Sequence, residues 1–257
     1  SRFHYTAIAF WCNKLAFVGL LYLVAVTVLV LLEPVLPCPS ATSIDLSNQF
    51  ARPDSVHWLG TDENGRDVFV RLIRGGRVSL AVGISGAVLT VLIGTSLGGI
   101  SGYFSGPVDQ VIMRFTDGLM SIPIFFLVLT VVAILGSSPL ILVAALALTR
   151  WMGTARLVRS EVLRHKEMEY VMAARSIGCT NLRIMIRHLL PQAVPSIIVA
   201  TSVGIGSVML IEAGLSFLGL GISPPTPSWG NMLTNSQYYI WSAPHLAVYP
   251  GLMILLS

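Results

Sequence analysis

The sequence predicts an all-α membrane protein with six transmembrane helices, and three observations lead to this fold class. Apolar residues make up 54% of the 257 residues and charged residues only 11%, whereas soluble domains average about 25% charged residues. The apolar residues gather in separate stretches close to the ~20 residues that a helix needs to cross a bilayer. The basic residues gather between two such stretches, which is typical of a cytoplasmic loop.

The six spans are predicted at residues 15–36, 78–103, 118–136, 139–156, 190–212 and 244 onward. They divide the chain into an N-terminal segment with the first transmembrane helix (1–36), a loop (37–77) and a core membrane domain (78–257). The first span is expected to stay as an anchor, because no small-residue cleavage site follows it. The last span begins at Pro244 and reaches only Ser257, which is too short to cross, so we expect it to be truncated here.

The uneven distribution of charge predicts which side of the membrane each loop faces. Residues 150–187 hold eight Lys or Arg and three acids, a balance of +5, and residues 188–257 hold no Lys or Arg. The positive-inside rule therefore places the basic segment and the N-terminus in the cytoplasm, and the loop 37–77 outside. A basic segment can also bind nucleic acid, but between two spans a cytoplasmic loop is the simpler interpretation. Four arginines near the second span oppose this orientation, but their long loop is balanced, with five Lys or Arg against five acids. They are Arg66, Arg71, Arg74 and Arg77.

No metal site is predicted. Asp62, Asn64 and Asp67 faintly resemble a calcium loop, but the Gly and the terminal Glu that such a loop requires are not at the right spacing. A structural turn held by Asp and Asn side chains is the better interpretation. The three cysteines are too far apart for a zinc or redox motif. They are Cys12, Cys38 and Cys179.

Two features of the core domain suggest how its helices pack and where it meets substrate. Small residues recur at four-residue intervals along the second span, which lets helices approach closely in lipid. They are Gly94, Gly98, Gly102 and Gly106. The pair Gly106-Pro107 is typical of a helix start, and this helix is expected to continue through Arg114 and Asp117 into the third span. Glu212, near the outer end of the fifth span, is a candidate outer gate or substrate contact, with a structural hydrogen bond as the alternative.

A charged helix–turn–helix is predicted between the fourth and fifth spans. Its first helix runs from Glu167 to Ile177 and ends at Gly178. Thr180 or Asn181 then caps a second helix, which leads into the fifth span at Pro191, where a missing N–H is harmless. The adjacent Ala173 and Ala174 give the first helix a flat surface that suits a groove on another protein. Charged side chains around it can form rim ion pairs that fix register; they are Glu169, Arg175, Arg183 and Arg187. The alternative is a basic loop without a partner.

The segment Tyr170–Pro191 resembles the coupling motif of binding-protein-dependent ABC importer permeases. Met172 stands where an acid is common, and His188 where an apolar residue is usual. Two further stretches resemble the dipeptide/oligopeptide/nickel permease family, and within it the second, "C-type" subunit. They are residues 59–67 and residues 215–232. The similarity extends from about residue 57 to the end.

The resemblance implies a type I ABC importer transmembrane subunit in the bacterial cytoplasmic (inner) membrane, with a cytoplasmic coupling helix at 167–178. It implies as partners a homologous permease, two ABC ATPase subunits and an extracytoplasmic substrate-binding protein. ATP and Mg would bind to the ATPases, because this chain has no Gly-x-x-x-x-Gly-Lys-Ser/Thr loop; no cofactor is expected in it. The implied ATPase-coupling residues are Glu169, Tyr170, Ala173, Ala174, Arg175, Gly178, Leu190 and Pro191.

Peptides are the first expectation for the substrate because of the breadth of that family, with nickel or a metal chelate as the alternative. Two other classes remain at this point. Ser85 and Ser101 lie in Gly-x-Ser-Gly patterns, and His245 could act as their base in an intramembrane serine protease, but such a base must lie within hydrogen-bond reach. A secondary transporter needs intramembrane charges for ion coupling, and Glu212 is the available candidate.

Overall fold

The computed structural model describes residues 13–33 and 40–257, and within these ranges the chain is helical, without strands. It forms two compact units, Ser1–Val78 with Pro224–Ser257, and Ser79–Ser223. Helix α3 (Val68–Phe104) begins in the first unit and continues into the second. Cys12, Cys38 and the last residues of the expected first span lie outside the described residues.

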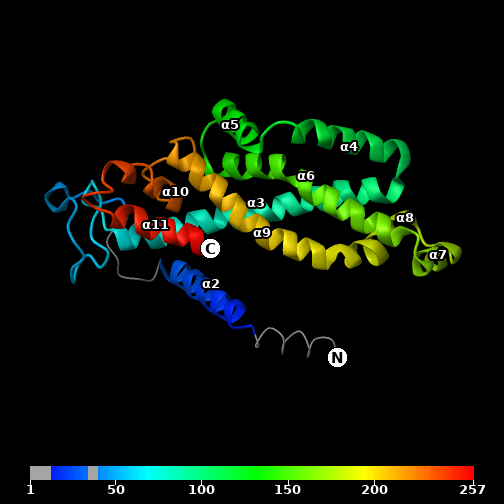
Figure 1. Cartoon of the computed structure of the whole chain (residues 1–257), viewed down its shortest axis with the longest axis horizontal. Helices are drawn as coiled ribbons and strands as arrows, with labels where there is room; N and C mark the ends of the chain where they lie inside the picture. The colour runs from blue at the N-terminus through cyan, green and yellow to red at the C-terminus, as the bar shows by residue number, and fades with distance from the viewer. Residues whose placement is uncertain (1–12, 34–39) are drawn as a thin grey trace. The chain divides into compact units, whose positions relative to one another are not determined.

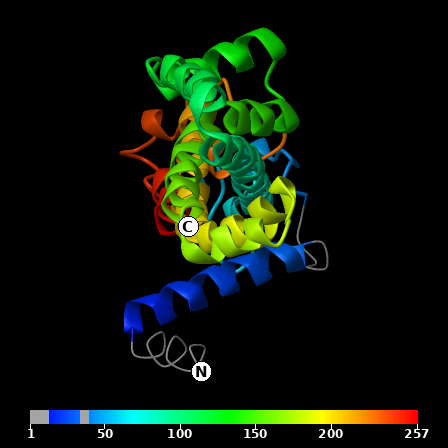
Figure 2. The same cartoon turned by 90° about the vertical axis from the view of Figure 1, so that its right-hand side faces the viewer.

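The second unit is a helical bundle (Figures 1 and 2). Besides its part of α3, it contains α4 (Gly106–Met120), α5 (Ile124–Leu135), α6 (Pro139–Lys166), α7 (Glu169–Ser176), α8 (Asn181–Ile184) and α9 (Leu190–Phe217). Helices α4, α5 and α9 all pack on α6. The most apolar window of α6 is 61% buried, against 11% for the continuous helix Asn181–Phe217. Most residues of α9 are therefore at least partly exposed at the surface of the unit.

Helix α3 approaches α6 closely along three of the four regularly spaced glycines. A Cβ atom on Gly94 would come within 2.6 Å of the Thr154 side chain, and one on Gly102 within 2.9 Å of the Arg159 carbonyl oxygen. A Cβ on Gly98 would overlap the Ala155 carbonyl oxygen. Gly106, which the same spacing assigned to this ridge, takes no part in it, because a Cβ there would meet nothing within 4 Å. Its φ of 58° instead serves the turn that opens α4.

The helix that starts at Gly106 does not continue into the third span. Helices α4 and α5 are separated by a break of three residues and bend by 85°. Pro123 explains the break, because proline disfavours the helical conformation of the residue before it and has no N–H to donate. It serves as the N-cap residue of α5.

The first unit contains an apolar helix, a long loop and the C-terminal helices. Its elements are α2 (Lys14–Leu32), the 3₁₀ helix Leu46–Asn48, α10 (Trp229–Met232), the 3₁₀ helix Ser236–Tyr238 and α11 (His245–Leu256). Trp229 is fully buried, and its indole N–H donates to the Leu72 carbonyl at 2.8 Å. Ser228 and Asn231 form a capping box that starts α10. The start of α3 is thus anchored to the segment that precedes α11.

The Asp-rich stretch of the loop is a turn held by side chains. Asp62 accepts hydrogen bonds from the backbone N–H groups of Asn64 and Arg66, at 2.8 and 3.0 Å. Asp67 caps α3 by accepting from the Val70 N–H at 3.0 Å, and its other oxygen lies 2.8 Å from His57 Nδ1. No cluster of potential metal ligands is found among the described residues.

The four arginines that opposed the predicted orientation are paired with acids. Arg66 and Arg71 both contact the Asp62 carboxylate, at 2.8 and 3.3 Å. Arg74 and Arg77 contact Glu33 at the end of α2, at 2.9 and 3.8 Å.

Each of the six predicted spans corresponds to an apolar helix or a bent pair. Four helices are long and apolar enough to cross a membrane, the bent pair α4–α5 counts as a fifth, and α11 is a shorter apolar helix. The main difference lies in α3, which begins at Val68, ten residues before the expected start of the second span.

Candidate functional site: the α7–α8 element and a membrane groove

The predicted helix–turn–helix is present, with α7 ending as its glycine requires. Gly178 adopts a φ of 82°. Its N–H donates to the Arg175 carbonyl at 2.9 Å, and the Cys179 N–H donates to the Ala174 carbonyl at 3.1 Å, which is the Schellman pattern. Helix α8 then passes through a π-helical turn, Met185–Leu189, into α9, with Pro191 in the first turn of α9.

One face of α7 packs against the rest of the second unit. Val171 is fully buried and Ala174 is 5% exposed. Both belong to a hydrophobic cluster that also holds residues of α3, α6, α8 and the π-helical turn: Tyr103, Val158, Val162, Ile184 and Leu189. Leu190 packs against this cluster. The element is therefore fixed to the ends of the long helices and can move with them.

Tyr103 ties the element to α3 by polar contacts as well. Its hydroxyl donates to Asn181 Oδ1 at 2.7 Å. The Arg175 guanidinium carbon lies 5.7 Å from the centre of its ring and the Lys166 ammonium 6.0 Å, within the range of cation–π attraction.

Outside this packed face, α7 and its C-cap residue Ile177 carry exposed apolar side chains. Ile177 is 81% exposed, Met172 52% and Tyr170 40%, and Ala173 is exposed beside them. We call these four residues the docking face. Exposed apolar residues that gather on one surface mark interaction sites. Of the two predicted alanines, only Ala173 belongs to this face, because Ala174 supports the fold from the other side.

Charged and polar groups border the docking face. Glu169 and Arg175 are exposed, as required for rim ion pairs with a partner. The Tyr170 hydroxyl lies 3.2 Å from His165 Nδ1. Burial of this hydroxyl raises the pKa of Tyr170 above its ordinary value.

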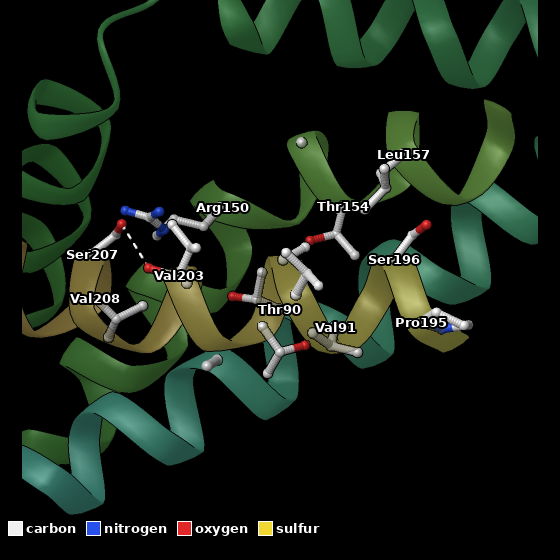
Figure 3. A pocket seen from close by; sticks show the side chains of 16 residues that line it. Thr90, Val91, Arg150, Thr154, Leu157, Pro195, Ser196, Val203, Ser207 and Val208 are labelled. Atoms are coloured by element: carbon white, nitrogen blue, oxygen red, sulfur yellow. Dashed lines mark hydrogen bonds between the residues drawn. The ribbon is translucent and has the colours of Figure 1, made fainter. Parts of the chain in front are cut away.

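A groove of about 740 Å³ opens between α3, α6 and α9. Figure 3 shows its lining, which is apolar apart from several hydroxyls and one charge. The hydroxyls belong to Thr90, Thr154, Ser196, Thr201 and Ser207, and the charge to Arg150. Arg150 also lines a second cavity of about 370 Å³, next to the break between α4 and α5.

Arg150 is the residue whose position the sequence interpretation missed. Arg150 was counted with the basic cytoplasmic segment 150–187. It follows Pro139 by only eleven residues, however, and so lies within the predicted fourth span. Its α6 neighbours Arg156 and Arg159 pair with Asp117 at 2.5 Å and with Asp109 at 2.5 and 2.6 Å. Its shorter distance from the start of the span could have distinguished Arg150 from Arg156 and Arg159.

Glu212 makes hydrogen bonds inside the second unit. It is 1% exposed, and its carboxylate accepts from the hydroxyls of Ser216 and Ser79, at 2.7 and 3.3 Å. The Ser216 oxygen in turn accepts from the Ile222 N–H at 3.0 Å. Glu212 is not among the residues that line the groove, and this geometry supports the structural alternative over an outer gate.

The two serines considered as nucleophiles are engaged elsewhere. Ser85 donates to the Ala81 carbonyl one turn earlier, and Ser101 donates to Asp109. His245 Nε2 is buried without a hydrogen-bond partner among the described residues. Each of the two serine hydroxyls therefore already donates to an acceptor that is not a histidine, whereas the nucleophile of a serine protease donates to its base.

Comparison with known proteins decides the family. The model of the family described as "Binding-protein-dependent transport system inner membrane component" matches residues 75–257. The chain belongs to this family. It is accordingly a permease, the membrane subunit of an ABC importer, and ATP hydrolysis belongs to separate ATPase subunits.

Curated permeases align with nearly the whole chain. The dipeptide transport system permease protein DppC of Alkalihalophilus pseudofirmus is 38% identical over 260 residues, which cover 98% of this permease and 86% of the relative. The oligopeptide permease protein OppC of Bacillus subtilis is 36% identical, covering 90% and 77%. The nickel permease protein NikC of Escherichia coli is 40% identical, covering 84% and 78%.

Solved importers share the fold. The permease resembles a chain of the inward-facing MetNI methionine ABC transporter with a TM-score of 0.56 at 19% identity, covering 72% of this chain and 89% of that one. An amino acid ABC transporter solved with histidines gives 0.50 at 20% identity, covering 72% and 84%. The predicted all-α fold of an importer membrane subunit is confirmed.

Proposed function

We propose that this permease, paired with a homologous permease, forms the path by which dipeptides or oligopeptides enter a bacterial cell. Two ABC ATPase subunits act from the cytoplasm, and an extracytoplasmic binding protein delivers the peptide. The observation that carries the coupling role is the docking face, an apolar exposed surface on a helix whose other side is packed into the bundle. Three of the similar permeases are named for dipeptide, oligopeptide or glutathione transport, which supports peptides as cargo.

The proposed mechanism is alternating access by rigid-body movement. Each ATPase subunit receives one α7 helix in a groove, and closure of the ATPase dimer on ATP brings the two α7 helices together. Because Val171 and Ala174 lock α7 to α3 and α6, these helices follow. The path opens outward, and hydrolysis resets it. In this orientation the N-terminus and α7 are cytoplasmic and the loop before α3 is outside, as the basic segment 150–187 indicates.

Nickel import is the second candidate, because a nickel permease is as similar as the peptide permeases. The two are separated by reconstituting the permease pair, the ATPases and the binding protein in proteoliposomes and measuring ATP-dependent uptake. We expect uptake of a labelled dipeptide, and we expect that added nickel does not inhibit this uptake. Uptake of ⁶³Ni without peptide uptake would favour the alternative, and uptake that continues without ATP would contradict both.

A further inference from the structure

The groove of the second unit holds a positive charge at membrane depth. Helix α6 begins at Pro139, and at 1.5 Å per residue Arg150 lies about 16 Å further along it. The hydrocarbon core of a bilayer is about 30 Å thick. With Pro139 at the outer interface, Arg150 lies near the middle of the membrane, where an ionisable residue is costly and marks a functional site by default.

Nothing in the described part of the chain neutralises this charge. The next two arginines of α6, Arg156 and Arg159, each have an aspartate on α4, whereas the structure gives Arg150 no carboxylate partner among the described residues. Glu161, which contacts a residue of the groove lining, accepts a hydrogen bond from Ser196 at 2.7 Å. The guanidinium is therefore left to bind something that enters the groove.

A second polar group in the lining also lacks a partner. Thr90 is only 8% exposed, and its hydroxyl makes no hydrogen bond among the described residues. A buried hydroxyl without a partner is unfavourable and is satisfied when a ligand supplies an acceptor. In the view of Figure 3, the Arg150 guanidinium lies at the same end of the groove as the Ser207 hydroxyl, away from Ser196 and Pro195.

We propose that Arg150, assisted by Thr90, binds the carboxylate of the cargo on its way through the permease. A guanidinium holds a carboxylate with two parallel hydrogen bonds, and the Thr90 hydroxyl in the same lining offers a further donor. The rest of the groove is apolar and fits uncharged side chains of different sizes. The membrane subunit would thus select for the C-terminal carboxylate of a peptide, separately from any selection by the binding protein. This inference rests on the proposed function.

The test compares uptake of dialanine and of dialanine amide by the complete complex in proteoliposomes. The readout is the ratio of variant to wild-type uptake for each peptide, which cancels any preference of the binding protein. Arg150→Gln should lower dialanine uptake about tenfold, as expected for a lost charge-assisted hydrogen bond, and leave amide uptake within about twofold. Arg156→Gln, on the same helix but outside the groove, should change both rates by the same factor.

Two other outcomes would overturn the inference, and a third would contradict the proposed function instead. An equal fall for both peptides in Arg150→Gln would mean that Arg150 supports the structure or pairs with an acid of the partner permease, and would overturn the inference. Unchanged uptake of both would overturn it too. A wild-type complex that transports neither peptide would contradict the proposed function itself. If the wild type excludes the amide although the binding protein binds it, the inference predicts that Arg150→Gln admits it.

Discussion

The hydroxyl of Tyr103, near the end of α3, donates a hydrogen bond of 2.7 Å to Asn181, the first residue of α8. Tyr103 is 5% exposed, and Arg175 of α7 lies over its ring. One side chain thus joins a long membrane helix to both short helices of the α7–α8 element. A displacement of α7 is therefore expected to move α3 as well.

Tyr103→Phe keeps the ring and removes this hydrogen bond. Because the substitution leaves Asn181 without its partner, we expect the complex to lose about 1 kcal/mol of stability. We also expect more ATP to be hydrolysed per peptide transported. The measurement is the ratio of ATP hydrolysis to uptake in proteoliposomes. A double-mutant cycle with Asn181→Ala isolates the pair; additive effects of the two substitutions would show that the bond transmits nothing.

Asp109→Ala breaks the contact that holds α4 on α6. Arg159 binds this carboxylate with two hydrogen bonds, and Ser101 donates to it as well. The expected loss is about 2 kcal/mol, typical of hydrogen bonds to a charged group, seen as a lower melting temperature of the purified complex. Asp117→Ala is the matched control, because its pair with Arg156 is exposed and should contribute at most about 1 kcal/mol.

Gly98→Ala should disrupt the packing of α3 on α6. The added methyl group would overlap the Ala155 carbonyl oxygen, so the two helices must separate, at a cost of about 1–3 kcal/mol. The yield and melting temperature of the complex measure the effect. Gly118→Ala has open space around the new methyl group and should be neutral or slightly stabilising. Equal behaviour of the two variants would contradict the close approach.

Ala173→Asp and Ala174→Asp should fail in different ways. The first adds a charge to the exposed docking face, so the permease should fold and lose its ATPase subunits on purification. The second buries a carboxylate in the cluster around Tyr103, which is strongly unfavourable, so folded protein should be lost. Detection of the permease and of co-purifying ATPase on the same gel separates these results. Loss of ATPase with folded protein in both variants would contradict the assignment of the two faces.

Hydropathy and the helix-breaking residues predicted most of the fold. The spans follow from apolar length alone. Gly178 marked the end of α7 and Pro191 the start of α9, because each residue imposes its own backbone geometry. The 85° bend between α4 and α5 was missed. Pro123 can end a helix or merely begin one, and only tertiary packing decides which occurs.

The candidate site was predicted in position but not in orientation. The motif located the coupling element, yet two adjacent alanines on a short helix face different directions, and sequence alone did not say that Ala174 faces the bundle. The spacing of the glycines was correct for Gly94, Gly98 and Gly102, but Gly106 has the same spacing and a different role. The place of Arg150 in the groove could be recognised only from the fold, because a groove formed by three distant segments has no signature in any one of them.

The most direct test of the central claim is a photo-crosslinking measurement at Ile177. A photoreactive residue is placed there, and at Leu148 of α6, which is also exposed but lies within the membrane span. After irradiation of the complex purified with its ATPases, we expect a covalent adduct of permease and ATPase from position 177 and none from position 148. Adducts from position 177 that contain no ATPase, in preparations where the ATPase is present, would show that α7 does not dock on the ATPase.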